Sequence, residues 1–363
     1  MILKYGMNPY QKYAELKENA HFRLINGSPS VINIMDALNS WQLVKEIKEY
    51  NGSVAAASFK HVTPSGVAVA AELSEKERTA YMVSMDAELS PGAMAYLRAR
   101  SSDRLASFGD FIALNCIVDK SAAKVIAAEV SDGLVAPGFE DEALEILKKK
   151  KKGAYVIFQI DPDYGPPRRE TKTIFGFEII QDRNELKITP EHITSNIVSK
   201  EKTLEKKTID DLCLGMIALK YTQSNSICAV KNGQVIGIGS GQQSRILCTE
   251  LALSKAKRWY EKLMLDYVKI DFPPKSKRTD KDQIIDKAYH QALASGKGAG
   301  KQCGLCLCSD GFFPQPDNIE AAALEGVKYI ASPMGSIRDR DIIDACDANS
   351  MVFCNTGVRL FHH

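Results

Sequence analysis

Two adjacent residues, Lys60 and His61, carry the side chains in this sequence that are best suited to chemistry. They follow an apolar run, residues 53–59, and precede the chain breakers Pro64 and Gly66. This pattern predicts a strand that ends in a basic pair, and open α/β sheets bind ligands beyond the carboxyl ends of their strands. Histidine can accept a proton near neutral pH, and a neighbouring lysine can stabilise negative charge. The pair is therefore a candidate for proton transfer, although a surface or structural role also fits a Lys-His dipeptide.

A glycine-rich segment, residues 237–245, is a candidate anion site. Its glycines would let backbone N–H groups approach a ligand, and Arg245 would lie near the N-terminus of the next helix, where phosphate is favoured. The segment matches neither a Walker loop nor the Gly-x-Gly-x-x-Gly pattern, because Gln242 occupies the place of the last glycine. A tight turn without a ligand is the alternative.

Three cysteines, Cys303, Cys306 and Cys308, raise the question of a metal site. Zinc needs four ligands, or three and a water, and the sequence offers no second pair at matching spacing. The alternation of leucine and cysteine instead favours a buried strand, so we expect no zinc. The nine cysteines lie mostly among apolar neighbours, which indicates reduced thiols in a cytoplasmic protein.

The charge balance of the sequence bears on which kinds of partner the protein binds. The 363 residues include 47 Lys and Arg against 45 Asp and Glu, so the formal charge is only +2. This balance gives no reason to expect nucleic acid or a membrane surface as a partner. The sequence shows no signal peptide, and no run approaches the roughly eighteen apolar residues of a membrane span.

Short apolar runs alternate with amphipathic stretches, which predicts an α/β fold to position these residues. One helix is predicted over residues 36–50. Another is predicted over 139–152, and its closing lysines are expected to be a solvated helix end and not a binding patch. Strands are predicted over residues 53–59, 111–118, 124–130, 154–160 and 327–331.

The later part of the chain contains a hairpin signal. Asn232 and Gly233 separate two apolar segments and supply the positive φ angles of a tight turn. A long helix is predicted over 244–265. Residues 162–207 are polar and are expected to form a connecting region. Residues 273–282 are also polar and are expected to form another link or a surface loop.

The triplet Ser-Asp-Gly occurs twice, at residues 131–133 and 309–311. Each copy precedes an acidic helix and a strand, and each is predicted to follow a strand. Residues 63–66 and 332–335 form a second pair of similar turns. We interpret the pattern as an ancient duplication that produced two similar α/β lobes, with chance similarity of turns as the alternative.

Segments in the same order along the chain carry a resemblance to one family. They include the Lys-His pair and the terminal histidines, and they comprise residues 5–9, 38–44, 58–64, 107–111, 130–138, 220–226, 237–245, 309–314 and 359–363. On these residues the chain resembles the AICAR transformylase domain of bifunctional purine-biosynthesis enzymes, where AICAR is 5-aminoimidazole-4-carboxamide ribonucleotide. The likeness runs from residue 4 to the last residue.

The resemblance implies two cytidine deaminase-like α/β lobes, residues 1–165 and 266–363, and a partly helical connecting segment, residues 166–265. It also implies a homodimer with active sites at its interface. The family's IMP cyclohydrolase domain has no counterpart in the sequence. Either the gene encodes a stand-alone transformylase or that domain was removed from a longer chain. Met1 lies just before the first matched residues, which favours the naturally short protein.

The implied reaction moves a formyl group from 10-formyltetrahydrofolate to the 5-amino group of AICAR, giving FAICAR and tetrahydrofolate. This amine is a poor nucleophile because its lone pair is delocalised, so a base must remove its proton as the bond forms. By resemblance His61 is that base, Lys60 stabilises the developing oxyanion, and His363 supports the transfer. The resemblance implies no zinc, and it admits a bound monovalent cation.

The resemblance also assigns binding residues. Those expected to contact AICAR are Lys4, Tyr5, His61, Gly109, Asp132, Asn225, Arg245, Phe312 and Arg359. Those expected to contact the folate are Ile246, Asp317, Ser336 and Ile337. Arginines suit anionic or carbonyl oxygens, and the amide of Asn225 suits the carboxamide.

Three residues depart from the family pattern. Lys4 replaces a common arginine, so a bidentate phosphate fork becomes a point charge and we expect a weaker grip on the nucleotide. Gln315 and Pro316 differ around Asp317, at the rim of the expected folate pocket. A catalytically silent sensor of AICAR or folate is the alternative function, which the intact Lys60 and His61 argue against. A formate- and ATP-dependent enzyme is disfavoured because the sequence has no ATP phosphate loop.

Overall fold

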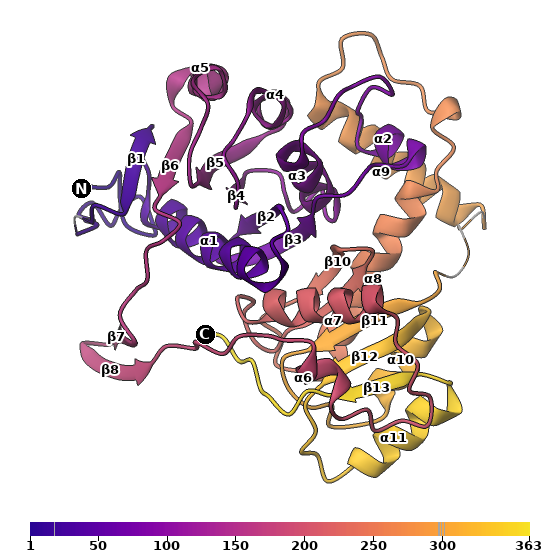
Figure 1. The fold of residues 1–363 in the computed structure, drawn as a ribbon. Coiled ribbons are helices and arrows are strands. Elements are labelled where there is room, and N and C mark those ends of the chain that lie inside the picture. The colour runs from indigo at the N-terminus through magenta and orange to yellow at the C-terminus, as the bar shows by residue number, and fades with distance from the viewer. Residues whose placement is uncertain (18, 297, 299, 301) are drawn as a thin grey trace.

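One mixed sheet organises the molecule. The computed structural model describes residues 1–17, 19–296, 298, 300 and 302–363. Eleven strands lie in the order β1-β6-β5-β4-β2-β3-β10-β9-β11-β12-β13. Helices cover both faces, and the N-terminal and C-terminal parts of the chain form the two ends of the sheet (Figure 1). The predicted α/β class is confirmed.

The two ends of the sheet are built from the same series of elements: a helix, a hairpin, and three helix–strand units. The first unit contains α1 (Val31–Asn51), β2 (Ala55–Lys60), β3 (Thr63–Val69), α3 (Pro91–Ser101), β4 (Asp110–Leu114), α4 (Lys120–Ala128), β5 (Ser131–Ala136), α5 (Asp141–Lys148) and β6 (Val156–Ile160). The second contains α7 (Lys206–Leu219), β9 (Ile227–Lys231), β10 (Gln234–Gly239), α8 (Arg245–Leu263), β11 (Leu305–Ser309), α10 (Asp317–Leu324), β12 (Val327–Ser332), α11 (Asp339–Ala348) and β13 (Val352–Asn355).

Strand pairing is also the same in the two units. In each, the first hairpin strand pairs antiparallel with the next strand of the unit, and the remaining strands pair parallel. This shared topology supports the duplication. The repeat places β9, β10 and α8 in the second unit, while the predicted boundaries at residues 165 and 265 remain a prediction.

The Ser-Asp-Gly triplets, however, are not equivalent in the repeat. Ser131 begins β5, whereas Ser309 ends β11, the counterpart of β4. The strand predicted over 124–130 was wrong, because this region belongs to helix α4. Asp119 caps that helix by accepting a hydrogen bond from the N–H of Ala122 at 2.8 Å. Within the run, Ile126 lies on the buried face of the helix, whereas Lys124 and Ala128 are exposed.

The two units share one core and each has another of its own. Strands β3 and β10 join the units antiparallel, with Val67 opposite Val235. Helices α1 and α7 contact each other on one face and cover a core that both units contribute to, including Leu43 and Ile217. On the other face, α3–α5 cover the first unit and α8, α10 and α11 cover the second. Continuous pairing and a shared core fix the two units relative to each other.

The remaining elements lie at the periphery. They are β1 (Phe22–Asn26), which pairs with β6, α2 (Glu75–Ala80), β7 (Arg169–Ile174), β8 (Phe177–Asp182), α6 (Glu191–Thr194), α9 (Arg278–Ala294) and two short 3₁₀ turns, Lys150–Gly153 and Tyr267–Lys269. Strands β7 and β8 form a ribbon that extends away from the sheet, inside the predicted connecting region (Figure 1). The hairpin of β9 and β10 confirms the Asn-Gly signal, since φ is 54° at Asn232 and 72° at Gly233.

Candidate active site

Both units bring their predicted site residues to the same edge of the sheet. In the first unit this edge contains the end of β2 and the starts of β3, β4 and β5. In the second it contains the start of β9 and the ends of β10, β11 and β12. Because β3 and β10 run antiparallel, the start of β3 lies on the same side as the end of β10. We call this the site edge.

The position of the Lys-His pair corrects one expectation. Lys60 does end its own strand, but β2 runs antiparallel to β4. The pair therefore lies beside the starts of the parallel strands β4 and β5. Only the second unit presents the carboxyl ends of its parallel strands to the site edge.

His61 and Val62 form the two-residue turn between β2 and β3, which we call the lysine–histidine turn. Their φ angles are 55° and 61°, in the left-handed region that a β-branched residue rarely adopts. The N–H of Val62 donates to the Asp36 carboxylate of α1 at 2.6 Å. Lys60 Nζ donates to the carbonyl of Phe108 at 2.7 Å, while the side chain of His61 is exposed. The turn thus holds an exposed imidazole beside a positioned ammonium.

Asp36 is a site-edge residue that the sequence analysis missed. Burial raises the pKa of its carboxyl to about 6, and the nearby carboxylates of Asp132 and Asp110 act in the same direction. N–H groups of the turn oppose this shift by donating hydrogen bonds. A single aspartate among the apolar residues of a helix was the available signal. Burial likewise raises the pKa of Asp110 to about 6.

Gly109 and Asp132 are neighbours beside this turn. A Cβ atom on Gly109, whose φ is 76°, would lie 3.9 Å from Asp132 Oδ1. Gly109 directly follows Phe108, the residue whose carbonyl accepts from Lys60. The structure therefore brings four predicted residues, Lys60, His61, Gly109 and Asp132, to one end of the first unit.

Two lysines of the predicted helix end also reach this place. Helix α5 stops at Lys148, and the following 3₁₀ turn directs the next lysines back toward β5. Lys150 Nζ donates to Ser131 Oγ at 2.6 Å, and Lys151 Nζ pairs with Asp132 Oδ1 at 2.5 Å. Burial lowers the pKa of Lys150 to about 7. The expectation of a solvated helix end was wrong for Lys150, which is half-buried, whereas Lys151 is exposed.

Lys4 and Tyr5 precede α1 at the same edge. The N–H of Lys4 donates to Pro29 at 2.9 Å, and the carbonyl of Tyr5 accepts from Val31 at 3.4 Å. Lys4 Nζ lies 5.6 Å from the centroid of the Tyr5 ring and its side chain is exposed. These contacts place both residues at the start of the helix that carries Asp36.

In the second unit, Asn225, Arg245 and Asp310 form what we call the arginine–aspartate cluster. Arg245 Nη1 pairs with Asp310 Oδ1, and the two side chains are 7% and 0% exposed. Arg245 Nη2 donates to Asn225 Oδ1 at 2.7 Å, and Asn225 Nδ2 donates to the carbonyl of Gln242 at 2.8 Å. Asp310 also accepts from the N–H of Ser226 at 3.0 Å. The sequence analysis quoted Asp310 in a motif but assigned it no role.

The C-terminal tail joins this cluster. The N–H of Leu360 donates to the carbonyl of Asp310 at 2.8 Å, which places Arg359 beside the site edge. Arg359 is exposed, and its guanidinium carbon lies 4.6 Å from the centroid of the Phe361 ring. His363 is also exposed, and its carbonyl accepts a hydrogen bond from Lys172 of β7.

The remaining predicted contacts lie around the same unit. Phe312 is 43% exposed, and a Cβ on Gly335 would lie 3.7 Å from its ring. The hydroxyl of Ser336 donates to the carbonyl of Pro314 at 3.4 Å, so the loops after β11 and β12 touch. The predicted folate contacts lie on these loops and on the first turns of α8 and α10: Ile246, Asp317, Ser336 and Ile337.

The glycine-rich segment has a packing role that its sequence does not reveal. A Cβ on Gly237 would lie 2.1 Å from the carbonyl oxygen of Ala252, and one on Gly239 would lie 2.2 Å from that of Cys248. These glycines allow β10 to pack directly against α8. A ligand near Arg245 therefore stays a prediction that the glycine pattern does not support by itself.

The cysteine segment forms buried strand β11, as predicted, with Cys306 and Cys308 inside the sheet. Among the described residues, no group of three or more His, Cys, Asp or Glu side chains could hold a metal ion. No helix in the described part of the chain is long and apolar enough to cross a membrane.

These observations define an α/β protein with two groups of polar side chains on one edge of a single sheet. Comparison with known proteins goes one step further. The profile of the AICARFT/IMPCHase bienzyme family matches residues 1–255, and the chain belongs to this family.

Three curated relatives carry the name bifunctional purine biosynthesis protein PurH. The one from Clostridium botulinum is 30% identical over 370 residues, which cover 100% of this chain and 59% of the relative. Those from Oceanobacillus iheyensis and Clostridium perfringens are each 29% identical and cover 99% of this chain, and 59% and 58% of the relative. The chain thus spans about three-fifths of the length of the curated relatives it matches.

Proposed function

We propose that this chain transfers the formyl group of 10-formyltetrahydrofolate to the 5-amino group of AICAR, as a cytoplasmic step of purine biosynthesis. The observation that carries the proposal is the lysine–histidine turn on the same sheet edge as Asn225 and Arg245. One group suits proton transfer and the other suits recognition of a polar ligand. Membership of the AICARFT/IMPCHase family supplies the reaction class.

The chemistry assigns different tasks to His61 and Lys60. The amine of AICAR attacks the formyl carbon, and the exposed imidazole accepts the proton that the amine loses as the C–N bond forms. The carbonyl oxygen gains negative charge, which the Lys60 ammonium stabilises. Collapse of the adduct then breaks the bond to the folate nitrogen, which takes up a proton and leaves as tetrahydrofolate. His363 supports this last proton transfer.

Recognition of AICAR falls to residues with spare hydrogen-bonding capacity. Asn225 uses one lone pair of Oδ1 within the protein, and its Nδ2 donates to the carbonyls of Gln242 and Gln243 at 2.8 and 3.3 Å. The second lone pair of Oδ1 remains to accept a hydrogen bond from the amide N–H of a carboxamide. The exposed guanidinium of Arg359 can pair with an anionic group, whereas the buried Arg245 orients the Asn225 amide.

We further propose that a second copy of the chain completes each site. The lysine–histidine turn and the arginine–aspartate cluster lie apart on the site edge, because strands β3 and β10 lie between β2 and β9 in the sheet. The ribbon of β7 and β8 exposes large apolar side chains, including Phe175 at 97% and Phe177 at 72%. Exposed apolar surface of this kind is typical of an interaction site. A closed two-fold dimer would bring the turn of one copy toward the cluster of the other.

The first experiment mixes purified protein with AICAR and 10-formyltetrahydrofolate and follows tetrahydrofolate formation by absorbance. We expect turnover in the parent and its loss in Lys60→Ala. The matched control is Lys152→Ala, an exposed lysine near the same edge, which should keep parental activity. If calorimetry detects AICAR binding but the assay detects no turnover, the chain is a sensor of AICAR and not an enzyme. Turnover only with formate and ATP would reject the folate as formyl donor.

The second experiment tests the shared site. Lys60→Ala and Arg359→Ala are each expected to be weakly active alone. If one site takes Lys60 from one copy and Arg359 from the other, a mixed dimer holds one intact site, and co-expression restores about a quarter of parental activity. Activity equal to the average of the two variants would show that each site lies within one copy.

A further inference from the structure

Lys60 depends on a backbone carbonyl for its position. A lysine side chain is long and flexible, and Lys60 Nζ donates to the carbonyl of Phe108 at 2.7 Å. Phe108 belongs to residues 102–109, the segment between α3 and β4, which we call the α3–β4 loop. The position of the Lys60 ammonium is therefore only as well defined as the position of this carbonyl.

The two residues that present this carbonyl have few contacts of their own. The Phe108 side chain is 53% exposed, and Gly109 has no side chain. The N–H of Phe108 donates to the carbonyl of Leu105 at 3.4 Å. The N–H of Gly109 donates to the carbonyl of Val130 at 3.3 Å. Both distances exceed the usual range of about 2.7–3.2 Å, so the residues on either side must fix the carbonyl.

Arg100 of α3 binds the residues on both sides of this pair. Its Nη1 donates to the carbonyl of Ser107 at 2.6 Å and to Asp110 Oδ1 at 3.1 Å. The first contact fixes the peptide that precedes Phe108, and the second fixes the residue that follows Gly109. One guanidinium thus holds both ends of the short segment that carries the lysine's acceptor.

Arg100 is itself firmly held. Its side chain is 2% exposed, and its Nε donates to Glu129 Oε2 at 3.0 Å. Glu129 also pairs with Arg104 at 3.2 Å and with Arg278 at 2.8 Å. A planar guanidinium reaches acceptors at Nε and Nη1 at the same time, whereas a single ammonium cannot. The arginine is therefore specific to this place and not only a buried positive charge.

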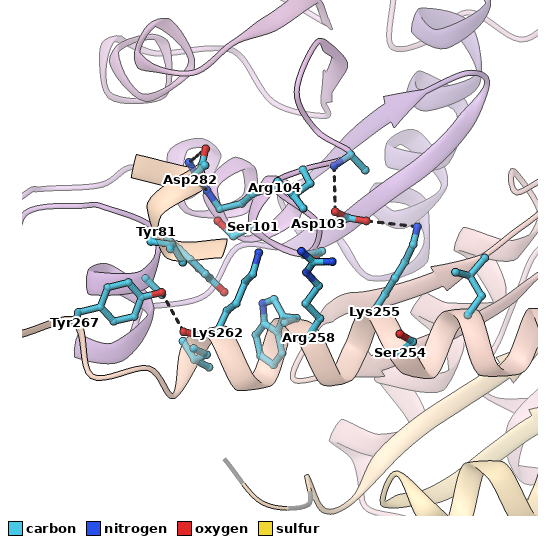
Figure 2. Close-up of a pocket in the computed structure, with 18 residues that line it drawn as sticks. Tyr81, Ser101, Asp103, Arg104, Ser254, Lys255, Arg258, Lys262, Tyr267 and Asp282 are labelled. Atoms are coloured by element: carbon cyan, nitrogen blue, oxygen red, sulfur yellow. Dashed lines mark hydrogen bonds and ion pairs between the residues drawn. The ribbon is translucent and has the colours of Figure 1, made fainter. Parts of the chain in front are cut away.

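The second unit holds the α3–β4 loop from its other side. Figure 2 shows Arg104 of the loop next to Asp282 of α9, and Arg104 Nε donates to that carboxylate at 2.6 Å. The carboxylate of Asp103 accepts from the N–H of Ala106 at 3.0 Å, and it pairs with Lys255 of α8 at 3.4 Å (Figure 2). Both units therefore contribute to one fixed loop beside the lysine–histidine turn.

We propose that Arg100 is a positioning residue for Lys60, a role that rests on the formyl transfer proposed above. By fixing the carbonyl of Phe108, Arg100 keeps the Lys60 ammonium where negative charge develops on the formyl oxygen. Stabilisation of this charge requires a donor that is already in place, because a misplacement of about 1 Å can cost roughly 10²-fold in rate. Arg100 is buried and acts only through the loop.

Arg98, two residues earlier on α3, offers a matched control. It is 2% exposed, against 1% for Arg100. It donates to the carbonyls of Val69 and Asn232. Val69 ends β3 and Asn232 follows β9, and both strands start at the site edge, so these acceptors lie at the opposite edge of the sheet. Arg98→Lys and Arg100→Lys thus make one change at equal burial on two opposite edges.

Steady-state rates test the effect on turnover. We expect Arg100→Lys to lower kcat roughly 10- to 100-fold while the KM for AICAR stays within about twofold, and Arg98→Lys to keep both values. In a Lys60→Ala background, Arg100→Lys should cause no further loss, because the side chain that it positions is absent. An unchanged kcat in Arg100→Lys, an equal loss in Arg98→Lys, or an undiminished loss in the Lys60→Ala background would overturn the proposal.

Asp110→Asn is a second variant that perturbs the fold less. Burial already raises the pKa of Asp110 to about 6, so the site tolerates a neutral amide of the same shape. The amide weakens one of the two contacts by which Arg100 holds the loop. We expect kcat to fall a few-fold at unchanged KM, with native circular dichroism. A parental kcat would contradict the role of the Asp110 contact.

Chemical labelling tests the position of Lys60 without catalysis. Trace acetic anhydride acetylates free amines, and peptide mass spectrometry compares Lys60 with the exposed Lys152. Loss of one hydrogen bond in Arg100→Lys should raise the labelling of Lys60 roughly two- to tenfold, and Arg98→Lys should leave it unchanged. Increased labelling with a parent that shows no turnover would reject formyl transfer and retain Arg100 as the anchor of Lys60. Turnover in the parent with unchanged labelling would reject the anchor.

Discussion

The two groups on the site edge differ in how the fold holds them. The lysine–histidine turn is a two-residue hairpin whose φ angles are both positive, and His61 is exposed. In the arginine–aspartate cluster, Arg245 and Asp310 are buried and ion-paired, and Asp310 is completely inaccessible, whereas Asn225 is half-buried. One group is held by backbone geometry and the other by charge pairing.

This difference matches the division of labour that we propose. A group that exchanges protons must reach its substrate and solvent, so an exposed turn is suitable. A group that recognises a ligand gains from donors fixed in advance, so a buried ion pair that orients Asn225 is suitable. Changes in the turn should therefore alter turnover, and changes in the cluster should alter stability and affinity.

The largest expected effect is on turnover in His61→Asn. Asparagine tolerates the left-handed region but cannot serve as a base near neutral pH. We expect kcat to fall roughly 10²–10⁴-fold, with no change in the free energy of unfolding beyond about 0.5 kcal/mol. Initial rates and urea unfolding measure the two quantities. Activity within threefold of the parent would remove His61 from the proposed chemistry.

In the arginine–aspartate cluster, we expect Asp310→Ala to lower the free energy of unfolding. The Arg245 charge would then be buried without its partner, which costs roughly 3–5 kcal/mol. Urea unfolding measures the loss, and Asp271→Ala, an exposed aspartate before α9, should change little. Replacing both members of the pair by Arg245→Met and Asp310→Leu should recover much of the stability. A loss below about 1 kcal/mol in the single variant would contradict a structural role for the pair.

Asp36→Asn tests the anchor of the turn through pH. Burial raises the pKa of Asp36 to about 6 from 3.8, so the folded protein prefers the neutral carboxyl. Its contribution to stability is present below pH 4 and is lost as the pH rises through about 6. The amide cannot ionise, so the variant should gain roughly 3 kcal/mol relative to the parent between pH 4 and 7. Urea unfolding at both pH values checks this, and an equal difference at the two would contradict it.

Local patterns in the sequence predicted much of the fold. The alternation of apolar runs gave the α/β class, and the pair Asn232-Gly233 located a hairpin because its φ requirement is local. The strand predicted over 124–130 was wrong because a short apolar run such as Val125-Ile126-Ala127 fits a strand as well as part of an amphipathic helix. The direction of β2 in the sheet could not be predicted, because no residue near Lys60 indicates that β2 pairs antiparallel with β4.

The residues of the candidate site could be predicted from the resemblance to a family. The side-chain contacts that hold these residues in place could not. Asp36 meets Val62 across 26 positions of the sequence, and Lys150 meets Ser131 across 19. No periodicity connects residues at such separations. The helix predicted over 139–152 was too long, because α5 ends before Lys150. The turn that follows directs the Lys150 side chain toward β5.

The smallest expected effect separates backbone strain from side-chain chemistry in the turn. Val62 has φ 61°, which costs a side-chain-bearing residue about 1–2 kcal/mol. Val62→Gly removes this cost, but glycine loses more conformational entropy on folding, so we expect a net gain of at most about 1 kcal/mol. Val62→Ala keeps the strain and serves as the control. If the strained turn also positions His61, the glycine variant should be as stable as the parent or more so, yet slower by a few-fold in kcat. Equal rates in the parent and Val62→Gly would show that the Asp36 contact alone positions the turn.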